Sequence, residues 1–214
     1  IQGGAGFIEP VNDYLIKVKK RCEEVGAMLI IDEIQPGFGR TGKLFGFQNY
    51  GIVPDIIAIG KGMASGMPVG AFVSSYERMQ LLAHNPKMGH ITTFGGNPVI
   101  AAASLVTLQE LLTTNLMEDT LRKEHLFRQY LQHPLIESIN GRGLMLAVIV
   151  PSAEIANYVV EYCQDNGLIV YWLLFELRAV RLSPPLTLTD EEIKQGCDII
   201  IEALESYILQ CKAI

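Results

Sequence analysis

Apolar residues along the chain fall either into short unbroken runs or into stripes with helical spacing. Two of the unbroken runs, residues 28–31 and 56–59, end near charged side chains: Asp32 follows the first directly and Lys61 follows the second by two residues. Short apolar runs of this kind are typical of strands that are buried on both faces of a parallel sheet. We therefore expect two buried parallel strands, joined by a glycine-rich loop over residues 36–51.

The stripes predict helices, and further apolar runs predict more strands. Helices are expected over residues 10–25, 76–83, 99–112, 117–131, 153–165 and 190–209. Strands are expected over residues 67–73, 139–150, 168–174 and 179–182. Gly26 is placed to end the first helix, and Thr189 to cap the start of the last one. His133 and Pro134 end the helix that precedes them, because proline cannot continue a helix.

The pattern changes near residue 133, from strands separated by long loops and helices to short strands around single helices. We expect an α/β fold in which residues 1–133 belong to a large, mainly parallel sheet domain with a bridging helix. Residues 134–214 are expected to form a small α+β domain. The chain begins with Ile1, inside an expected strand-to-loop passage, so we expect it to be a piece of a longer protein.

The ends of the two expected parallel strands are the natural place for chemistry. Ligands of open α/β sheets bind beyond the carboxyl ends of the strands, where Asp32 would supply a buried acid and Lys61 an amine. A pyridoxal phosphate (PLP) site needs this pair, since a lysine holds its aldehyde as a Schiff base and a carboxylate pairs with the pyridinium nitrogen. Gly60 and Gly62 would leave room for a planar cofactor. The alternatives are a strand-end acid that caps the next turn and a solvated loop lysine.

Two further segments offer groups that bind anions. Thr92 and Thr93 precede two glycines and could donate to a phosphate oxygen, although a turn before a helix has the same pattern. Arg181 ends a strand before two prolines, where its guanidinium could hold a carboxylate through two hydrogen bonds. The alternative for Arg181 is an edge-strand arginine that pairs with a surface acid.

The chain contains the motifs Ile31-Asp32-Glu33-Ile34-Gln35, Gly37-Phe38-Gly39-Arg40-Thr41-Gly42, Pro54-Asp55-Ile56-Ile57 and Gly60-Lys61-Gly62. Together these motifs closely resemble the class III (ornithine/acetylornithine/4-aminobutyrate type) aminotransferases. The resemblance covers nearly the whole chain but only the C-terminal half or so of a complete enzyme. It implies a fold-type I PLP-dependent transferase that moves an amino group from an ornithine-like or ω-amino substrate to a 2-oxo acid, with 2-oxoglutarate as the expected acceptor.

The resemblance also assigns roles to individual residues. Lys61 would bind the PLP aldehyde and move a proton, Asp32 would hold the pyridinium, and Gln35 would lie near the 3-hydroxyl group of the cofactor. Thr93 would reach the PLP phosphate of a neighbouring subunit, which implies a homodimer with a shared active site. Arg181, in a segment similar to the family's R-x-x-P-P-L, would bind the substrate carboxylate.

The chain departs from the family pattern at two positions. Gly4 stands where many members carry a glutamate that pairs with the substrate arginine, and Ile91 stands where many have glycine. Without that glutamate, the identity of the amine donor stays open. Arg40 is expected to be structural.

Composition excludes several other classes. With 49% hydrophobic and 19% charged residues the chain can bury a core, and its net charge of −6 argues against a nucleic-acid surface. The small basic clusters at residues 17–21 and 122–123 are expected to form solvated helix faces. The four cysteines lack C-x-x-C spacing, so we expect reduced core thiols, no metal site and a cytoplasmic protein. No apolar run is long enough to predict a membrane role.

Three other functions compete with aminotransfer. Another fold-type I PLP reaction, by an aminomutase, a racemase or a decarboxylase, needs the same acid and lysine. A nucleotide-binding module lacks support because no G-x-G-x-x-G or G-x-x-x-x-G-K-[ST] motif follows a strand. An inactive fragment that acts only as an interaction domain is the third possibility.

Overall fold

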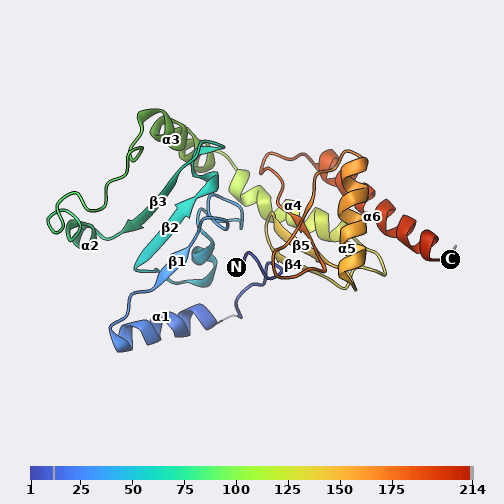
Figure 1. Ribbon diagram of the computed structural model, residues 1–214, viewed down its shortest axis with the longest axis horizontal. Helices are drawn as coiled ribbons and strands as arrows, with labels where there is room; N and C mark the ends of the chain where they lie inside the picture. The colour runs from blue at the N-terminus through green and yellow to red at the C-terminus, as the bar shows by residue number, and fades with distance from the viewer. Residues whose placement is uncertain (12, 213–214) are drawn as a thin grey trace. The chain divides into compact units, whose positions relative to one another are not determined.

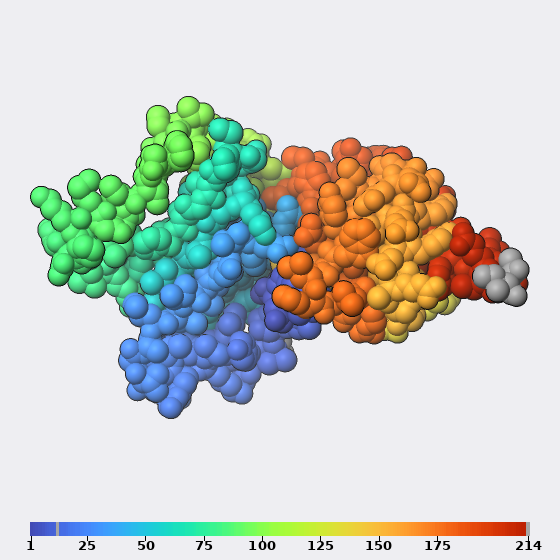
Figure 2. Space-filling model, in the orientation of Figure 1, coloured from blue at the N-terminus to red at the C-terminus, as the bar shows by residue number. Residues whose placement is uncertain are grey.

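The structure, a computed structural model, describes residues 1–11 and 13–212 and divides into two compact units (Figures 1 and 2). The Asp32 unit consists of residues 11–39 and 43–115. The Arg181 unit consists of residues 1–10, 40–42 and 116–214. Each unit has its own sheet.

The Asp32 unit contains a three-stranded sheet with the order β1-β2-β3. Its elements are α1 (Tyr14–Val25), β1 (Ile30–Asp32), η1 (Gly46–Tyr50), β2 (Ile56–Gly60), η2 (Lys61–Ala64), β3 (Gly70–Ser74), α2 (Tyr76–Gln80) and α3 (Pro98–Thr113). Strands β1 and β2 are parallel, as their apolar runs predict, and β3 is antiparallel to β2. Gly26 ends α1 in the left-handed conformation, at φ 70°.

The expectation that these strands are buried on both faces is wrong. Ile30 of β1 is 58% exposed, and Phe72 and Val73 of β3 are 47% and 48% exposed. The reason is that β1 and β3 are the edges of a narrow sheet, each with a single neighbouring strand among the described residues. Helix α3 likewise exposes apolar side chains, namely Val99, Leu105, Val106 and Leu112.

The Arg181 unit contains a four-stranded antiparallel sheet with the order β4-β5-β7-β6 (Figure 1). Its elements are α4 (Leu116–Tyr130), β4 (Ser138–Arg142), β5 (Met145–Ile149), α5 (Ala153–Asp165), β6 (Tyr171–Trp172), β7 (Ala179–Leu182) and α6 (Asp190–Lys212). This arrangement is the α+β architecture that the sequence predicts for the second part of the chain.

The single strand predicted over residues 139–150 is instead a hairpin of β4 and β5. The chain reverses at Gly143, which has a φ of 62°. Gly141 is equally constrained, because it has a φ of 100° and a Cβ there would lie 1.9 Å from the Met145 carbonyl oxygen. Two glycines two residues apart therefore break what the apolar pattern presents as one strand.

The main core of the Arg181 unit lies between its sheet and its helices. Val148 and Val180 of the sheet pack with Val159 of α5 and Ile200 of α6 in one buried cluster. Phe127 of α4 belongs to the same cluster. The predicted division at residue 133 falls after α4, whereas the contacts group α4 with the residues that follow it, because α4 packs into this core.

A second, smaller cluster covers the other face of this sheet. Phe7, which is fully buried, packs with Met145, Ala147, Leu173 and Ala179. The first residues of the chain therefore serve as a cover for this face, and an isolated antiparallel bridge between Gln2 and Ile8 closes them into a loop.

The cysteines of the described residues form no disulfide. Cys163 and Cys197 are buried, and burial raises the pKa of each thiol to about 12. The prediction of core thiols is wrong for Cys211, which is exposed near the end of α6. No metal-binding cluster occurs in residues 1–11 and 13–212. Over the same residues no single helix is long and apolar enough to cross a membrane, and only α3 and α4 taken together meet the length and composition of a span.

One carboxylate ties the elements of the Asp32 unit together. The Asp55 carboxylate accepts hydrogen bonds from the Leu29 amide at 2.8 Å, from Lys19 of α1 at 3.0 Å and from Arg78 of α2 at 2.6 Å. The carbonyl oxygen of Asp55 also accepts a hydrogen bond from the Ser74 hydroxyl, at the end of β3. The Leu29 amide and the two cations lower the pKa of Asp55.

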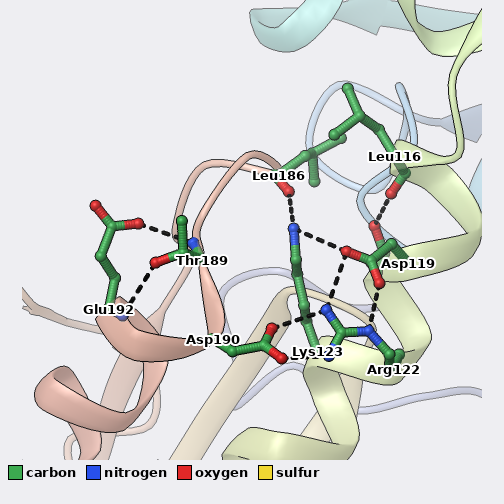
Figure 3. A network of polar contacts seen from close by, with 9 residues as sticks. Leu116, Asp119, Arg122, Lys123, Leu186, Thr189, Asp190 and Glu192 are labelled. Atoms are coloured by element: carbon green, nitrogen blue, oxygen red, sulfur yellow. Dashed lines mark hydrogen bonds and ion pairs between the residues drawn. The ribbon is translucent and has the colours of Figure 1, made fainter.

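Two cations, the buried Lys123 and the half-buried Arg40, fix the segment that follows β7 in the Arg181 unit. The Lys123 ammonium, in a side chain that is 6% exposed, donates to the Leu186 carbonyl at 2.6 Å and pairs with Asp119 at 3.1 Å (Figure 3). The Arg40 guanidinium donates to the carbonyls of Leu144 and Pro184, both at 2.8 Å. The expectation of a solvated face is therefore wrong for Lys123, whose amine has a backbone partner, and the structural role expected for Arg40 is confirmed.

The same close-up shows how α6 begins. The Thr189 hydroxyl accepts a hydrogen bond from the Glu192 amide, and the Glu192 carboxylate accepts one from the Thr189 amide (Figure 3). This reciprocal pair is a capping box, which confirms the predicted cap. Arg122, which is half exposed, bridges Asp119 of α4 and Asp190 of α6.

The Asp55 cluster generates a pH-dependent stability prediction. Asp55→Asn should lower the free energy of unfolding by about 1–2 kcal/mol at pH 7, because three donors lose a charged acceptor. Since folding lowers the pKa of Asp55 below its unfolded value of about 3.9, this contribution is present above about pH 4 and is lost as the pH falls through the folded-state pKa. Urea unfolding of both proteins between pH 7 and pH 2 measures the difference.

The matched control is Asp198→Asn, because Asp198 pairs with Lys194 on an exposed face of α6. Solvent screens that pair, so its loss should leave the unfolding midpoint unchanged. Equal effects of the two substitutions, or an Asp55 effect that does not depend on pH, would contradict the role assigned to the cluster.

The buried lysine of α4 generates a second stability prediction. Lys123→Met keeps the apolar stem but leaves the Leu186 carbonyl without its donor, so the free energy of unfolding should fall by about 1–3 kcal/mol. Arg122→Met is the control one residue away, and should cost much less because water screens its ion pairs. Urea unfolding at pH 7 compares the two; a larger loss from Arg122→Met would show that the buried contact is not the dominant one.

Candidate active site

The two predicted strand ends lie at the same edge of the sheet in the Asp32 unit. Because β1 and β2 are parallel, and Asp32 is opposite Ala58, both strands run toward this edge in register. Lys61 follows three residues after Ala58, directly beyond the last residue of β2. The structure thus brings Asp32 and Lys61 to the place where ligands of open α/β sheets bind.

Asp32 is exposed, which corrects the expectation of a buried acid. It ends an edge strand, so β2 is its only strand neighbour in the part of the chain that is described. Its Oδ1 accepts a hydrogen bond from the Ile34 amide at 2.9 Å, as an acid that caps a turn does. Its Oδ2 makes no hydrogen bond with a described residue, so one oxygen is oriented by the turn and the other is available to a ligand.

Lys61 occupies a sharp turn. Its φ of 43° is left-handed, which is uncommon for a residue with a side chain. It is exposed, and its amine forms no hydrogen bond or ion pair with any residue in the described ranges. Beyond η2, Ser65 also has a positive φ of 45°, and its hydroxyl lies 2.9 Å from that of Thr107 in α3.

The loop after β1 is held by Glu33, a residue whose importance the sequence did not indicate. Its carboxylate is buried and accepts hydrogen bonds from the amides of Gly46 at 2.7 Å and Phe47 at 2.8 Å. Burial raises the pKa of Glu33, and the two amide donors oppose that rise. The partners lie 13 and 14 residues away in a loop, so no local pattern could have predicted the contact.

Gln35 and Thr93 are less constrained. Gln35 is half-buried, three residues after Asp32, and Thr93 is exposed in the loop before α3. No hydrogen bond among the described residues joins either side chain to Asp32 or Lys61. Their proposed roles in cofactor binding therefore stay predictions.

A cavity of about 700 Å³ lies within the Asp32 unit. It is lined by Met63, two residues after Lys61, and by Thr92 and Phe94, which flank Thr93. Its other walls include Phe38 and Ala71. Figure 2 shows the surface hollowed between the green segment before α3 and the teal strand β3. The turn after Lys61 and the Thr93 loop thus border the same space.

Arg181 lies in β7 of the other unit, half-buried, beside a cavity of about 300 Å³. Its guanidinium carbon is 5.3 Å from the ring centroid of Tyr171, the residue opposite it on β6. No acid or other hydrogen-bond acceptor pairs with Arg181 among the described residues, so the alternative of a surface ion pair is wrong there. The sequence did not single out Tyr171, because its contact depends on how β6 pairs with β7.

Gly4 lies directly against Phe175. A Cβ at this position would lie 2.9 Å from the Phe175 ring, and the Phe175 amide donates to the Gly4 carbonyl at 2.9 Å. A glutamate at Gly4 would therefore have to displace the aromatic side chain. The departure from the family pattern is thus coupled to the position of Phe175.

Comparisons with known proteins show the family of the chain. The family model described as aminotransferase class-III matches residues 1–204. The chain is 39% identical over 211 residues to a putrescine aminotransferase of Pectobacterium atrosepticum, covering 94% of this chain and 45% of that protein. It is 35% identical over 209 residues to an acetylornithine aminotransferase of Caldanaerobacter subterraneus, covering 95% and 51%.

A solved structure of an aminotransferase has a similar fold. The ornithine aminotransferase of Toxoplasma gondii, with PLP partially occupying its active site, superimposes with a TM-score of 0.89 at 33% identity. The match covers 99% of this chain and 50% of that one, so the chain spans about half the length of the relatives it matches. The strand-end acid and lysine, the family match and the fold together show that this chain belongs to the class III aminotransferases, a family of fold-type I, PLP-dependent enzymes.

Proposed function

We propose that the protein is an aminotransferase that moves an amino group from an ornithine-like or ω-amino substrate to a 2-oxo acid, with 2-oxoglutarate as the acceptor. The observation that carries the proposal is the register of β1 and β2, which sets Asp32 and Lys61 at one sheet edge. The named relatives act on putrescine, acetylornithine and ornithine, all of which carry an amino group at the end of an aliphatic chain.

The residues at this edge fit PLP. Among the described residues, neither the Oδ2 of Asp32 nor the amine of Lys61 has a hydrogen-bond partner. PLP, when bound, supplies an aldehyde for the substrate amine and a ring that withdraws electrons from the substrate carbon. Asp32, Gln35 and Lys61 would hold the cofactor, together with Thr93 of a second copy of the chain.

The chemistry of the chain itself rests on two groups. The Lys61 Nζ takes a proton from the substrate carbon that bears the amino group and delivers a proton in the return direction. The Asp32 Oδ2, which has no partner among the described residues, would accept a hydrogen bond from the ring nitrogen of PLP and favour the protonated form of that nitrogen. The Ile34 amide, by fixing Oδ1, orients the carboxylate for this contact.

Arg181 is proposed to bind the substrate carboxylate. A guanidinium holds a carboxylate with two parallel hydrogen bonds, which requires that it not be paired with a protein acid. Tyr171 supports the guanidinium from its face and leaves its N–H groups available.

The shared site requires a homodimer, because Thr93 would act on the cofactor of the neighbouring copy. The small-molecule partners of the protein would be an amino acid or amine and a 2-oxo acid. Its proposed location is the cytoplasm. The competing reactions of an aminomutase, a racemase or a decarboxylase use the same acid and lysine, but they form no glutamate from 2-oxoglutarate. Glutamate formation with putrescine, ornithine or acetylornithine as the donor therefore separates them from aminotransfer.

Removing the lysine tests the proposal directly. In the protein as its gene encodes it, Lys61→Ala should lower the rate of glutamate formation by about 10²–10⁴-fold, because the base is lost. Borohydride should no longer fix the cofactor to the peptide that contains position 61. Lys87→Ala, an exposed lysine in the same unit, is the control and should match wild type in both measurements. Full activity of Lys61→Ala would refute the proposal.

Shortening the arginine tests substrate binding. Arg181→Lys should raise the KM for 2-oxoglutarate roughly 30-fold, about 2 kcal/mol, because a lysine cannot form the two-pronged bond. The reaction of PLP with putrescine, which has no carboxylate, should be unaffected in a single turnover. Arg178→Lys is the control, since Arg178 is already paired with Glu176 and Glu137. If Arg181→Lys slows both substrates alike, the residue does not recognise the carboxylate.

A further inference from the structure

Phe38 and Lys61 are two of the residues with side chains that adopt a left-handed backbone conformation in the Asp32 unit, and Phe38 packs against the residue directly after Lys61. Lys61 has a φ of 43° and Phe38 a φ of 57°. Such conformations cost free energy and persist only where the surroundings enforce them, most often at functional sites. The question is therefore what enforces the turn at Lys61.

Phe38 is packed against the backbone directly after Lys61. A Cβ built on Gly62 would lie 3.3 Å from the Phe38 Cβ and 3.9 Å from its Cγ, so the aromatic side chain covers the glycine. Phe38 is itself buried, with 9% of its surface exposed. Its amide donates to the Leu44 carbonyl, and its ring meets that of Phe45 edge to face, with the centroids 5.7 Å apart.

The far side of the turn is fixed as well. Ala64, the last residue of η2, is 1% exposed, and the next residue, Ser65, reaches Thr107 of α3 through its hydroxyl. The backbone of Lys61 is thus held between a buried aromatic residue and a helix. A change of the Lys61 backbone would displace Gly62 from Phe38 or Ser65 from Thr107.

We propose that Phe38 is a positioning residue that holds the left-handed turn of Lys61 and so aims its amine at the cofactor aldehyde. In this role Phe38 acts through the backbone of Gly62, against which it packs. The inference rests on the proposed function of Lys61 and adds the residue on which the orientation of its amine depends. Fixing the backbone removes freedom that a lysine would otherwise lose on bonding, which favours the bonded state.

The positioning role predicts different effects on the binding of two forms of the cofactor, PLP and pyridoxamine phosphate. With PLP, the neutral Lys61 amine adds to the aldehyde carbon and a C=N bond replaces the C=O bond. The aldehyde oxygen leaves as water with the two protons of the amine. Pyridoxamine phosphate carries an amine in place of the aldehyde and cannot form this bond. Misplacing the Lys61 amine should therefore weaken the binding of PLP and spare that of pyridoxamine phosphate.

The test compares Phe38→Ala with Phe38→Leu in the protein as its gene encodes it. Equilibrium dialysis should give a Kd for PLP about tenfold higher in Phe38→Ala, equivalent to about 1.4 kcal/mol. The Kd for pyridoxamine phosphate should change less than twofold. Phe38→Leu, which keeps an apolar side chain against Gly62, should stay within about threefold of wild type for both ligands. Circular dichroism checks that each variant is folded.

A second set of variants tests the contact itself and keeps the inference testable if Phe38→Ala does not fold. Gly62→Ala crowds the Phe38 Cβ and should weaken PLP binding. Phe38→Gly removes that Cβ and suits a positive φ. The double variant should therefore bind PLP no worse than Gly62→Ala alone, which is the sign of coupled residues.

The outcomes separate the inference from the proposed function. If wild type shows no cofactor fixed to Lys61 after borohydride treatment, the proposed function fails. If wild type is fixed at Lys61, but Phe38→Ala weakens PLP and pyridoxamine phosphate equally or changes neither, the positioning role is wrong. Additive effects in the double variant would also overturn it.

Discussion

The hydrogen bond from the Leu29 amide to the Asp55 carboxylate is the constraint on which the candidate active site depends. Asp55 precedes β2 and Leu29 precedes β1, so this bond joins the two strands at their starts and fixes their register. The same carboxylate, by binding Lys19 and Arg78, anchors α1 and α2 to that point. Because the strands are parallel and begin in register, their functional ends also coincide. Asp55, at the amino ends of the two strands, thereby determines where Asp32 and Lys61 lie at their carboxyl ends.

Strand register places backbones, and loop contacts must then orient the side chains. Glu33 fixes the loop after β1, since its buried carboxylate accepts hydrogen bonds from two backbone amides of η1. That loop carries Phe38, whose contact with Gly62 restrains the turn of Lys61. Asp32 needs less support, because a single amide fixes one of its oxygens. The candidate site is therefore formed by two strand ends together with a few loop contacts that orient its side chains.

The sequence predicts the features that depend on local pattern and misses those that depend on tertiary contacts. Periodicity locates α5 and β7, Gly26 marks the end of α1, and Thr189 marks the start of α6. It presents β4 and β5 as one strand, because both are apolar and the left-handed φ of Gly143 cannot be seen in the letters. Neither the burial of Lys123 nor the contact of Phe38 with Gly62 has a local signal, since each partner lies more than 20 residues away.

The cations of the Arg181 unit show how the proposed binding residue, Arg181, differs from the structural ones. Arg40 is half-buried and Lys123 is buried, and each has acceptors that compensate for its lost hydration: two carbonyls for Arg40, and a carbonyl and the Asp119 carboxylate for Lys123. Arg181 lies in the strand that leads into the segment they fix, yet its contact is the face of Tyr171 and no described acceptor. An aromatic face stabilises a guanidinium without using its N–H donors. A half-buried cation whose donors are left without protein partners gains most from an added anion, and for that reason a carboxylate is the ligand that suits this position.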